Sequence, residues 1–408
     1  MFSELTLEIT KKLTKTEKKN FGIFITPQSI ISQLHDSIKE CTDTSLVKRI
    51  LEPSCGTCEI VKFCDNLYKS VEIDAIEYNE TIYNSIKDLS FNINNKNKVT
   101  IIRENFIKYK TDDKYDLIIG NPPYLVCKKE EVPPEYEEYV HGRPNIFGLF
   151  ILHSLSLLKE NGILALIIPK SFLNSLYYSK IRNYIKQTCT ILKIDDYEKS
   201  NDFIDTEQST FGLIIQKGFK EEQEKEDKYS ILLNGNYIFT NDALQLGELF
   251  QGSTTLLNMG LKVRTGQIVW NEHKKNLTDD PEDTILIYNT NISKKNEFEI
   301  KQFKNDEKKQ YINLAGRIDP ILVVNRGNGN SSYKLNYTIM KRGPFLTENH
   351  LNEIYSSVPV DSDQLLQIYE KIIVSFKNPK TQQFIDTFLG NNSLSKTELE
   401  SIFPIYLS

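Results

Sequence analysis

Residues 116–124 read Asp-Leu-Ile-Ile-Gly-Asn-Pro-Pro-Tyr, and this stretch constrains the fold more than any other. The apolar run Leu117–Ile119 stops at Gly120 and two prolines, which predicts a buried strand followed by a fixed loop. The loop places the amide of Asn121 and the ring of Tyr124 just past the strand end, where open α/β sheets bind ligands. An ordinary Pro-Pro turn that closes a strand would account for the same residues taken alone.

The chemistry of this loop suits a planar amine. Asn121 Oδ1 and the Pro122 carbonyl can both accept hydrogen bonds from an NH2 group. Pro123 stiffens the loop, and Tyr124 can stack on the ring that carries the amine. The rest of the sequence is needed to choose between this interpretation and a simple turn.

Length and composition limit the classes of protein to which this chain can belong. A chain of 408 residues exceeds the usual size of one domain, so we expect two. The net charge of −5 argues against a purely electrostatic nucleic-acid binder, although it leaves room for a local basic cleft. The sequence lacks a signal-peptide pattern and an apolar run long enough to span a membrane. We expect a protein of the cytoplasm, or of the interior of a virus-infected host cell, with no membrane partner.

Cysteine spacing predicts neither disulfides nor a metal site. Cys55, Cys58 and Cys64 lie close together, but no second Cys/His pair follows at zinc-site spacing. We expect reduced cysteines and no bound metal.

The first half of the chain alternates strands and helices in the manner of a doubly wound α/β sheet. A first strand turns through a small-residue loop into a helix over Arg49–Ile60, which lets a ligand meet a helix N-terminus. A second strand, Ile73–Ile76, ends at Glu77, where such a fold places an acid for ribose hydroxyls. A surface glutamate at a strand end is the alternative explanation.

Two further positions in this half are candidates for ligand contacts. Asn105 and Phe106 follow the strand Val99–Arg103 and can serve an adenine ring, or simply a turn and a core. Thr26 precedes the helical pattern Ile30–Ile38, where its hydroxyl can hold a carboxylate or cap the helix. Four strand ends in succession carry more weight than any one of these motifs.

Between residues 125 and 217 the sequence predicts a mobile loop and then the rest of the sheet. Residues 125–144, rich in charge and proline, are able to cover a substrate. A helix over Asn145–Lys159 and strands at Gly162–Ile168, Ile191–Ile194 and Gly212–Gln216 follow.

The second half changes to short, β-prone segments separated by turns rich in Asn, Gly, Ser and Lys. Two of its loops, Val263–Asn271 and Asn325–Asn330, carry side chains that can read base edges and phosphates. An irregular structural domain is the alternative. The candidate recognition residues are Arg264, Gln267, Trp270, Asn271 and Arg326.

This order of motifs resembles the TaqI-type adenine-N6 DNA methyltransferases of type II restriction-modification systems. The resemblance covers the first 217 residues motif by motif: Phe21–Pro27, Leu51–Gly56, Glu77 and the tetrapeptide Asn121–Tyr124. It extends loosely into the second half. It implies a Rossmann-like S-adenosyl-L-methionine-dependent catalytic domain over residues 1–235 and a mixed α+β DNA target-recognition domain over 236–408.

The resemblance also assigns roles to single residues. Asn121, Pro122, Pro123 and Tyr124 would be catalytic, and Phe24 and Phe203 would pack on a flipped adenine. The residues that would form the S-adenosyl-L-methionine pocket are Thr26, Glu52, Cys55, Gly56, Glu77, Asn105, Phe106 and Phe150. Two positions depart from the family pattern: Cys58 stands where many relatives carry Gly, and Asn105 replaces the usual Asp.

The implied reaction is methylation of adenine N6 in double-stranded DNA by a monomer, with a separate cognate restriction endonuclease as a partner. The same tetrapeptide also serves enzymes that methylate glutamine N5 in proteins, but those lack a large C-terminal domain. RNA adenine and a non-catalytic DNA-binding specificity protein are the remaining alternatives, and the intact tetrapeptide argues against the latter.

Overall fold

The computed structural model describes residues 3–12, 26–91, 93–142, 144–197, 210–218, 227–327, 333–389 and 394–407. The chain divides into two compact units, Met1–Ala243 and Leu244–Ser408. The division falls later than the boundary at residue 235 expected from the sequence. The hairpin of β8 (Ser230–Leu233) and β9 (Asn236–Phe239) explains the difference, because Phe239 packs into the core of the first unit.

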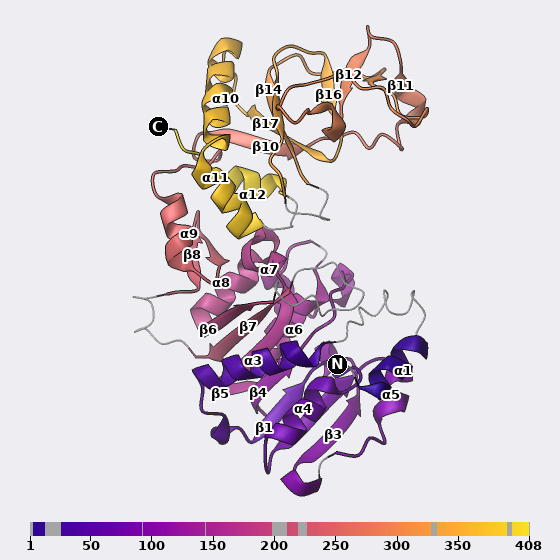
Figure 1. The fold of residues 1–408 in the computed structure, drawn as a ribbon, viewed down its shortest axis with the longest axis vertical. Coiled ribbons are helices and arrows are strands. Elements are labelled where there is room, and N and C mark those ends of the chain that lie inside the picture. The colour runs from indigo at the N-terminus through magenta and orange to yellow at the C-terminus, as the bar shows by residue number, and fades with distance from the viewer. Residues whose placement is uncertain are drawn as a thin grey trace. The chain divides into compact units, whose positions relative to one another are not determined.

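A seven-stranded sheet forms the centre of the first unit, in the order β3-β2-β1-β4-β5-β7-β6 (Figure 1). The pairs from β3 to β5 are parallel, and β7 runs antiparallel to both of its neighbours. The strand order reverses between β1 and β4, which is where doubly wound sheets open a ligand site. The strands are β1 (Arg49–Glu52), β2 (Glu72–Glu77), β3 (Lys98–Arg103), β4 (Tyr115–Gly120), β5 (Leu158–Pro169), β6 (Cys189–Asp196) and β7 (Thr210–Lys217).

Both faces of this sheet are buried, because the strands are apolar on both sides. Along β5 the odd-numbered residues from Ile163 to Ile167 belong to one core, and the even-numbered residues from Leu164 to Ile168 to the other. Three helices cover the first face: α3 (Gln28–Cys41), α4 (Glu59–Leu67) and α5 (Glu80–Ile86). The second face is covered by α6 (Ile146–Leu157), α7 (Ser171–Asn174) and α8 (Ser179–Thr188). Helix α1 (Glu4–Lys12) precedes them.

The segment predicted to be a mobile loop contains two short 3-10 helices, η4 (Lys129–Glu131) and η5 (Pro134–Tyr139). Tyr136 is buried against α6, and its hydroxyl lies 2.9 Å from His153 Nδ1. This part of the segment therefore packs on the domain. Buried side chains on α6 face both this segment and the sheet, which explains why that helix is apolar on nearly every side.

The second unit is built from two four-stranded sheets and a helical C-terminal part. One sheet has the order β10-β17-β14-β15 and the other β11-β13-β12-β16. The strands are β10 (Leu261–Thr265), β11 (Leu277–Thr278), β12 (Thr284–Ile287), β13 (Tyr311–Ile312), β14 (Ile321–Asn325), β15 (Tyr337–Met340), β16 (Phe345–Thr347) and β17 (Leu351–Ser356). The helices are α9 (Ala243–Phe250), which begins at the boundary, α10 (Ser362–Phe376), α11 (Pro379–Phe384) and α12 (Lys396–Ser401). Within the described ranges, no helix is both long and apolar enough to cross a lipid bilayer.

Candidate active site

The site lies at the carboxyl ends of four adjacent parallel strands. β3, β2, β1 and β4 are neighbours in the sheet, so the loops that follow them share one edge. Glu52, Glu77, Arg103 and Gly120 are the last residues of these strands. The sheet therefore brings together the loops that the sequence predicted from four separate segments.

The amide of Asn121 is held on both sides. Its Nδ2 donates a hydrogen bond of 3.0 Å to Thr26 Oγ1, and its Oδ1 accepts one of 2.6 Å from the Tyr124 hydroxyl. The Tyr124 hydroxyl also lies 2.9 Å from the Ile167 carbonyl at the end of β5. Burial raises the pKa of Tyr124 well above its usual value, so this hydroxyl stays a donor. The two bonds hold the amide in place between Thr26 and Tyr124.

Thr26 makes a contact with the tetrapeptide that the sequence did not predict. Helix α3 is capped at Pro27 without a side-chain hydrogen bond, so Thr26 is not the helix cap. Its hydroxyl instead accepts from Asn121, which lies 95 positions further along the chain. Thr26 is buried and thus belongs to the surroundings of the tetrapeptide.

The last residues of β1 and β4 approach each other closely. A Cβ atom on Gly120 would meet Glu52 Oε1 at 2.7 Å and Pro53 Cδ at 3.0 Å, so only glycine fits. Glu52 is 2% exposed, and its Oε1 accepts from the Ser54 amide at 3.2 Å. Burial raises the pKa of the Glu52 carboxyl to about 8, and the nearby charge of Glu77 acts in the same direction.

Glu77 and Gly56 form a second contact across the strand ends. Gly56 has φ +51°, a conformation that favours glycine, and its amide donates to Glu77 Oε2 at 2.9 Å. Glu77 Oε1 accepts from the Asn79 amide at 2.6 Å. Burial raises the pKa of Glu77, and this effect is larger than the opposite effect of the backbone hydrogen bonds on the pKa. The carboxylate is therefore oriented beside the loop after β1, where Cys55 is also buried.

The loop after β3 presents an apolar floor. The rings of Phe106 and Phe150 lie 4.7 Å apart between centroids, and His153 packs on Phe106 at 4.8 Å. Asn105 Oδ1 accepts from the Ile107 amide at 3.1 Å and so caps the short helix η3 (Phe106–Lys108). One lone pair of that side-chain carbonyl remains for another donor.

Of the predicted recognition residues, two already have partners within the second unit. Arg264 Nε donates to the buried carboxylate of Glu353 at 2.6 Å, and Arg326 Nη1 donates to the Asn349 carbonyl at 3.0 Å. The other three differ in exposure: Gln267 and Asn271 are exposed, and Trp270 is half-buried. Phe24 and Phe203 lie outside the described residues.

Sequence reasoning missed Ser54, whose hydroxyl donates to the Asn121 carbonyl at 3.2 Å. It also missed Glu59 at the start of α4. The Glu59 carboxylate accepts from Ser3 and Thr6 of the N-terminal segment, and the Thr6 hydroxyl lies 2.7 Å from that of Thr57. The only indication in the sequence was that Ser54 and Glu59 lie in or next to the loop after the first strand. The sequence around such side chains does not show which groups they will bond.

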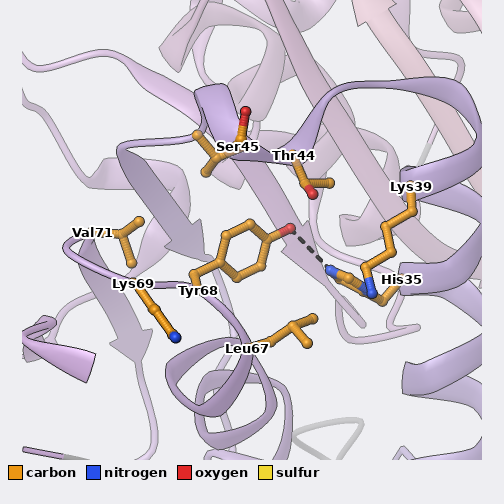
Figure 2. A pocket seen from close by; sticks show the side chains of 9 residues that line it. His35, Lys39, Thr44, Ser45, Leu67, Tyr68, Lys69 and Val71 are labelled. Carbon is orange, nitrogen blue, oxygen red and sulfur yellow. Dashed lines mark hydrogen bonds between the residues drawn. The ribbon is translucent and has the colours of Figure 1, made fainter. Parts of the chain in front are cut away.

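A separate pocket of about 370 Å³ lies at the opposite edge of the sheet. Figure 2 shows His35 and Tyr68 facing each other across it, joined by a contact of 3.2 Å between His35 Nε2 and the Tyr68 hydroxyl. Thr44 and Ser45 precede β1 and Lys69 precedes β2, so these residues lie at the amino ends of the strands. The pocket is therefore distinct from the candidate active site.

The strand order and the antiparallel seventh strand define the class I S-adenosylmethionine-dependent methyltransferase fold, which confirms the predicted fold class. Residues 36–203 match the Eco57I restriction-modification methylase family. This part of the chain is therefore similar to restriction-modification methylase domains, and S-adenosyl-L-methionine is the cofactor that the fold and this match imply.

The chain is also similar to several named proteins. Type II methyltransferase M.CvrRI of Paramecium bursaria Chlorella virus XZ-6E is 27% identical over 417 residues, covering 100% of this chain and 99% of the relative. Modification methylase CviBIII of Paramecium bursaria Chlorella virus NC1A is 28% identical over 415 residues, covering 99% of each chain. Among solved structures, the EcoKI M protein of a type I restriction enzyme has a TM-score of 0.37 at 16% identity, covering 48% of this chain and 44% of that one. The resemblance to type II restriction-modification methyltransferases is confirmed.

The residues at the strand ends fit this cofactor. A carboxylate at the end of β2 suits ribose hydroxyls, and the buried Phe106–Phe150 pair makes the neighbouring strand end apolar, as a purine requires. Nothing lies within 4 Å of the position that a Cβ on Gly56 would take, so the backbone of this loop is open to a ligand. Among the described residues, no three His, Cys, Asp or Glu side chains gather as a metal site would require.

Proposed function

We propose that this protein is a site-specific DNA methyltransferase that transfers a methyl group from S-adenosyl-L-methionine to N6 of an adenine flipped out of duplex DNA. The observation that carries the proposal is the placement of Asn-Pro-Pro-Tyr at the carboxyl end of β4, with the Asn121 amide held between Thr26 and Tyr124. Methylation of glutamine or of RNA adenine uses similar chemistry, and the experiment below separates these substrates.

Adenine N6 is a poor nucleophile because its lone pair is delocalised into the ring. Hydrogen bonds from its two amine hydrogens to Asn121 Oδ1 and the Pro122 carbonyl favour a pyramidal nitrogen, whose lone pair is then free to attack. S-adenosyl-L-methionine, when bound, supplies an electrophilic methyl group. The contribution of the chain is positioning and electrostatic preorganisation.

Thr26 supports this role by fixing the amide. Its hydroxyl accepts a hydrogen bond of 3.0 Å from Nδ2 and so holds the amide in place from the side opposite Tyr124. The Tyr124 hydroxyl shares Oδ1 with the incoming amine, since an amide oxygen has two lone pairs. Thr26 is thus a positioning residue, while Asn121 and Pro122 touch the reacting group.

The target base must leave the duplex, at a cost of a few kcal/mol. Stacking on Tyr124 offsets part of this cost, and Phe24 and Phe203 are the further rings proposed to hold the base. Glu77, Gly56, Phe106 and Phe150 would hold the cofactor on the neighbouring strand ends, together with Thr26, Glu52, Cys55 and Asn105.

Duplex DNA is the favoured substrate because relatives named as methyltransferases of type II systems match the chain over nearly its whole length. The second unit, Leu244–Ser408, is then the target-recognition domain. In this proposal the protein acts as a monomer, and its methylation protects DNA from a separate restriction nuclease.

The test is transfer of labelled methyl from S-adenosyl-L-methionine to duplex DNA, followed by digestion to nucleosides. Label in N6-methyldeoxyadenosine is the expected result, and sequencing of modified sites then gives the recognised sequence. Label found only in RNA or in a protein glutamine would refute DNA as the substrate.

A further inference from the structure

One lysine in the second unit is held by aromatic rings instead of by a carboxylate. Lys308 Nζ lies 4.0 Å from the ring centroid of Tyr288, 4.9 Å from that of Phe303 and 5.6 Å from that of Trp270. We call these three rings the aromatic cage. Tyr288 and Phe303 pack edge to face at 4.9 Å, and the Tyr288 hydroxyl donates to the Lys309 carbonyl at 2.9 Å. The cage is thus fixed to the segment that carries Lys308.

Three lysines near Lys308 have anionic partners, which Lys308 lacks in the described part of the chain. Lys309 pairs with Asp279 and Lys274 with Glu307, both at 2.6 Å, and Lys301 pairs with Glu299. Lys308 has no carboxylate within 4.0 Å and no side-chain hydrogen bond among the described residues. Its ammonium carries three N–H donors, which ring faces attract but do not satisfy as an oxygen acceptor would.

The surroundings of Lys308 make this charge costly in the free protein. Burial lowers the pKa of Lys308, and Glu348 acts in the opposite direction. Glu348 is itself buried, lies 2.7 Å from His350 Nδ1 through its Oε1, and forms no ion pair with the ammonium within 4.0 Å. An anionic oxygen arriving from outside would supply both the charge and the acceptor that the aromatic cage lacks.

We propose that Lys308 binds a phosphodiester oxygen of the nucleic-acid backbone, as a contact that is independent of sequence. This inference rests on the proposed function, because it needs DNA as the substrate. Trp270 belongs to the predicted recognition loop, yet the ammonium groups of Lys308 and Lys274 lie within 6 Å of its ring. In this proposal Trp270 positions Lys308, beside the recognition role predicted for it from the sequence.

The aromatic cage also lowers the entropy cost of binding a phosphodiester oxygen with a lysine side chain. An exposed lysine loses rotamer freedom when it binds, which costs roughly 0.5–1.5 kcal/mol for an immobilised side chain. The cage already restricts Lys308 before DNA arrives, so less of that freedom remains to be lost.

The test is binding of the full chain to a labelled duplex of arbitrary sequence, measured over a series of salt concentrations. Lys308→Met keeps the apolar stem within the cage and removes the charge. We expect roughly tenfold weaker binding, the size of one charge-assisted hydrogen bond. The slope of log K against log salt should become shallower by about 0.9. The loss should be equal on every sequence tested.

Two further variants keep the result interpretable. Lys309→Met removes an ion-paired charge from the next position and should bind like the wild type, and Lys308→Arg should restore most of the affinity. Thermal unfolding checks that Lys308→Met is folded. Equal affinity and slope for Lys308→Met and the wild type would overturn the inference, as would an equal loss in Lys309→Met.

Failure of the proposed function gives a different pattern. A wild-type chain that binds duplex DNA but transfers no methyl group to it refutes the proposed reaction, while the comparison of Lys308 with Lys309 still stands. A Lys308→Met variant that binds like the wild type, in a chain that methylates DNA, refutes only the phosphate contact.

Discussion

The Tyr124 hydroxyl donates a hydrogen bond of 2.6 Å to Asn121 Oδ1, the atom proposed to accept from the target amine. The tetrapeptide is therefore a connected unit, in which the aromatic ring also fixes the amide. Thr26 completes this unit from the other side of the amide.

Tyr124→Phe separates the two roles of this residue. The variant keeps a ring for stacking but loses the hydroxyl that orients Asn121, so we expect kcat to fall roughly tenfold, the value of one hydrogen bond, with KM for DNA nearly unchanged. Tyr124→Ala removes stacking as well and should also raise KM. Steady-state kinetics on both variants checks this, and equal KM values for the two would contradict a stacking role.

Gly120→Ala tests the close approach of β4 to β1. The new Cβ would lie 2.7 Å from Glu52 Oε1 and 3.0 Å from the Pro53 ring, so we expect destabilisation by about 1–3 kcal/mol. Gly247→Ala is the matched control, because α9 has open space there and alanine favours helices by roughly 0.5–1 kcal/mol. Urea unfolding should therefore move in opposite directions for the two variants.

Glu52 predicts a specific pH dependence of stability. Its pKa of about 8 in the folded protein exceeds the ordinary value of 4.5, so the folded state keeps a proton that the unfolded state releases. Stability from this group is complete below pH 4.5 and is lost as the pH rises to about 8. The steepest loss is about 1.4 kcal/mol per pH unit.

Glu52→Gln lacks this titration. The difference in unfolding free energy between the variant and the wild type should therefore grow in favour of the variant across that range and level off above it. Denaturant unfolding at several pH values measures the difference. Parallel curves for the two proteins would mean that Glu52 is not buried as a neutral acid.

Several features of the first unit could be predicted from the sequence because they depend on local patterns. Apolar runs that end in Gly, Pro or an acid marked β4 and β2 and, with them, Asn121 and Glu77. Alternation of strands and helices was enough to predict the doubly wound sheet.

Other features depend on contacts between distant segments, which local patterns do not contain. Thr26 is not the cap of α3, and the contact of its hydroxyl with Asn121 could not be predicted. The ion pair of Arg264 with Glu353 could not be predicted either, because it depends on the register between β10 and β17. The first unit ends at Ala243 and not at residue 235 for the same reason, because the hairpin β8–β9 packs on the first unit.

Asn121 is the residue on which the proposed reaction depends most, and its role is tested most directly by single-turnover methyl transfer by Asn121→Ala, with cofactor affinity measured in parallel. We predict a loss of at least about 100-fold in the rate, as for removal of an oxyanion-hole donor, with S-adenosyl-L-methionine binding largely unchanged. A variant that retains substantial activity, or one that loses cofactor binding and activity together, would contradict the assigned role.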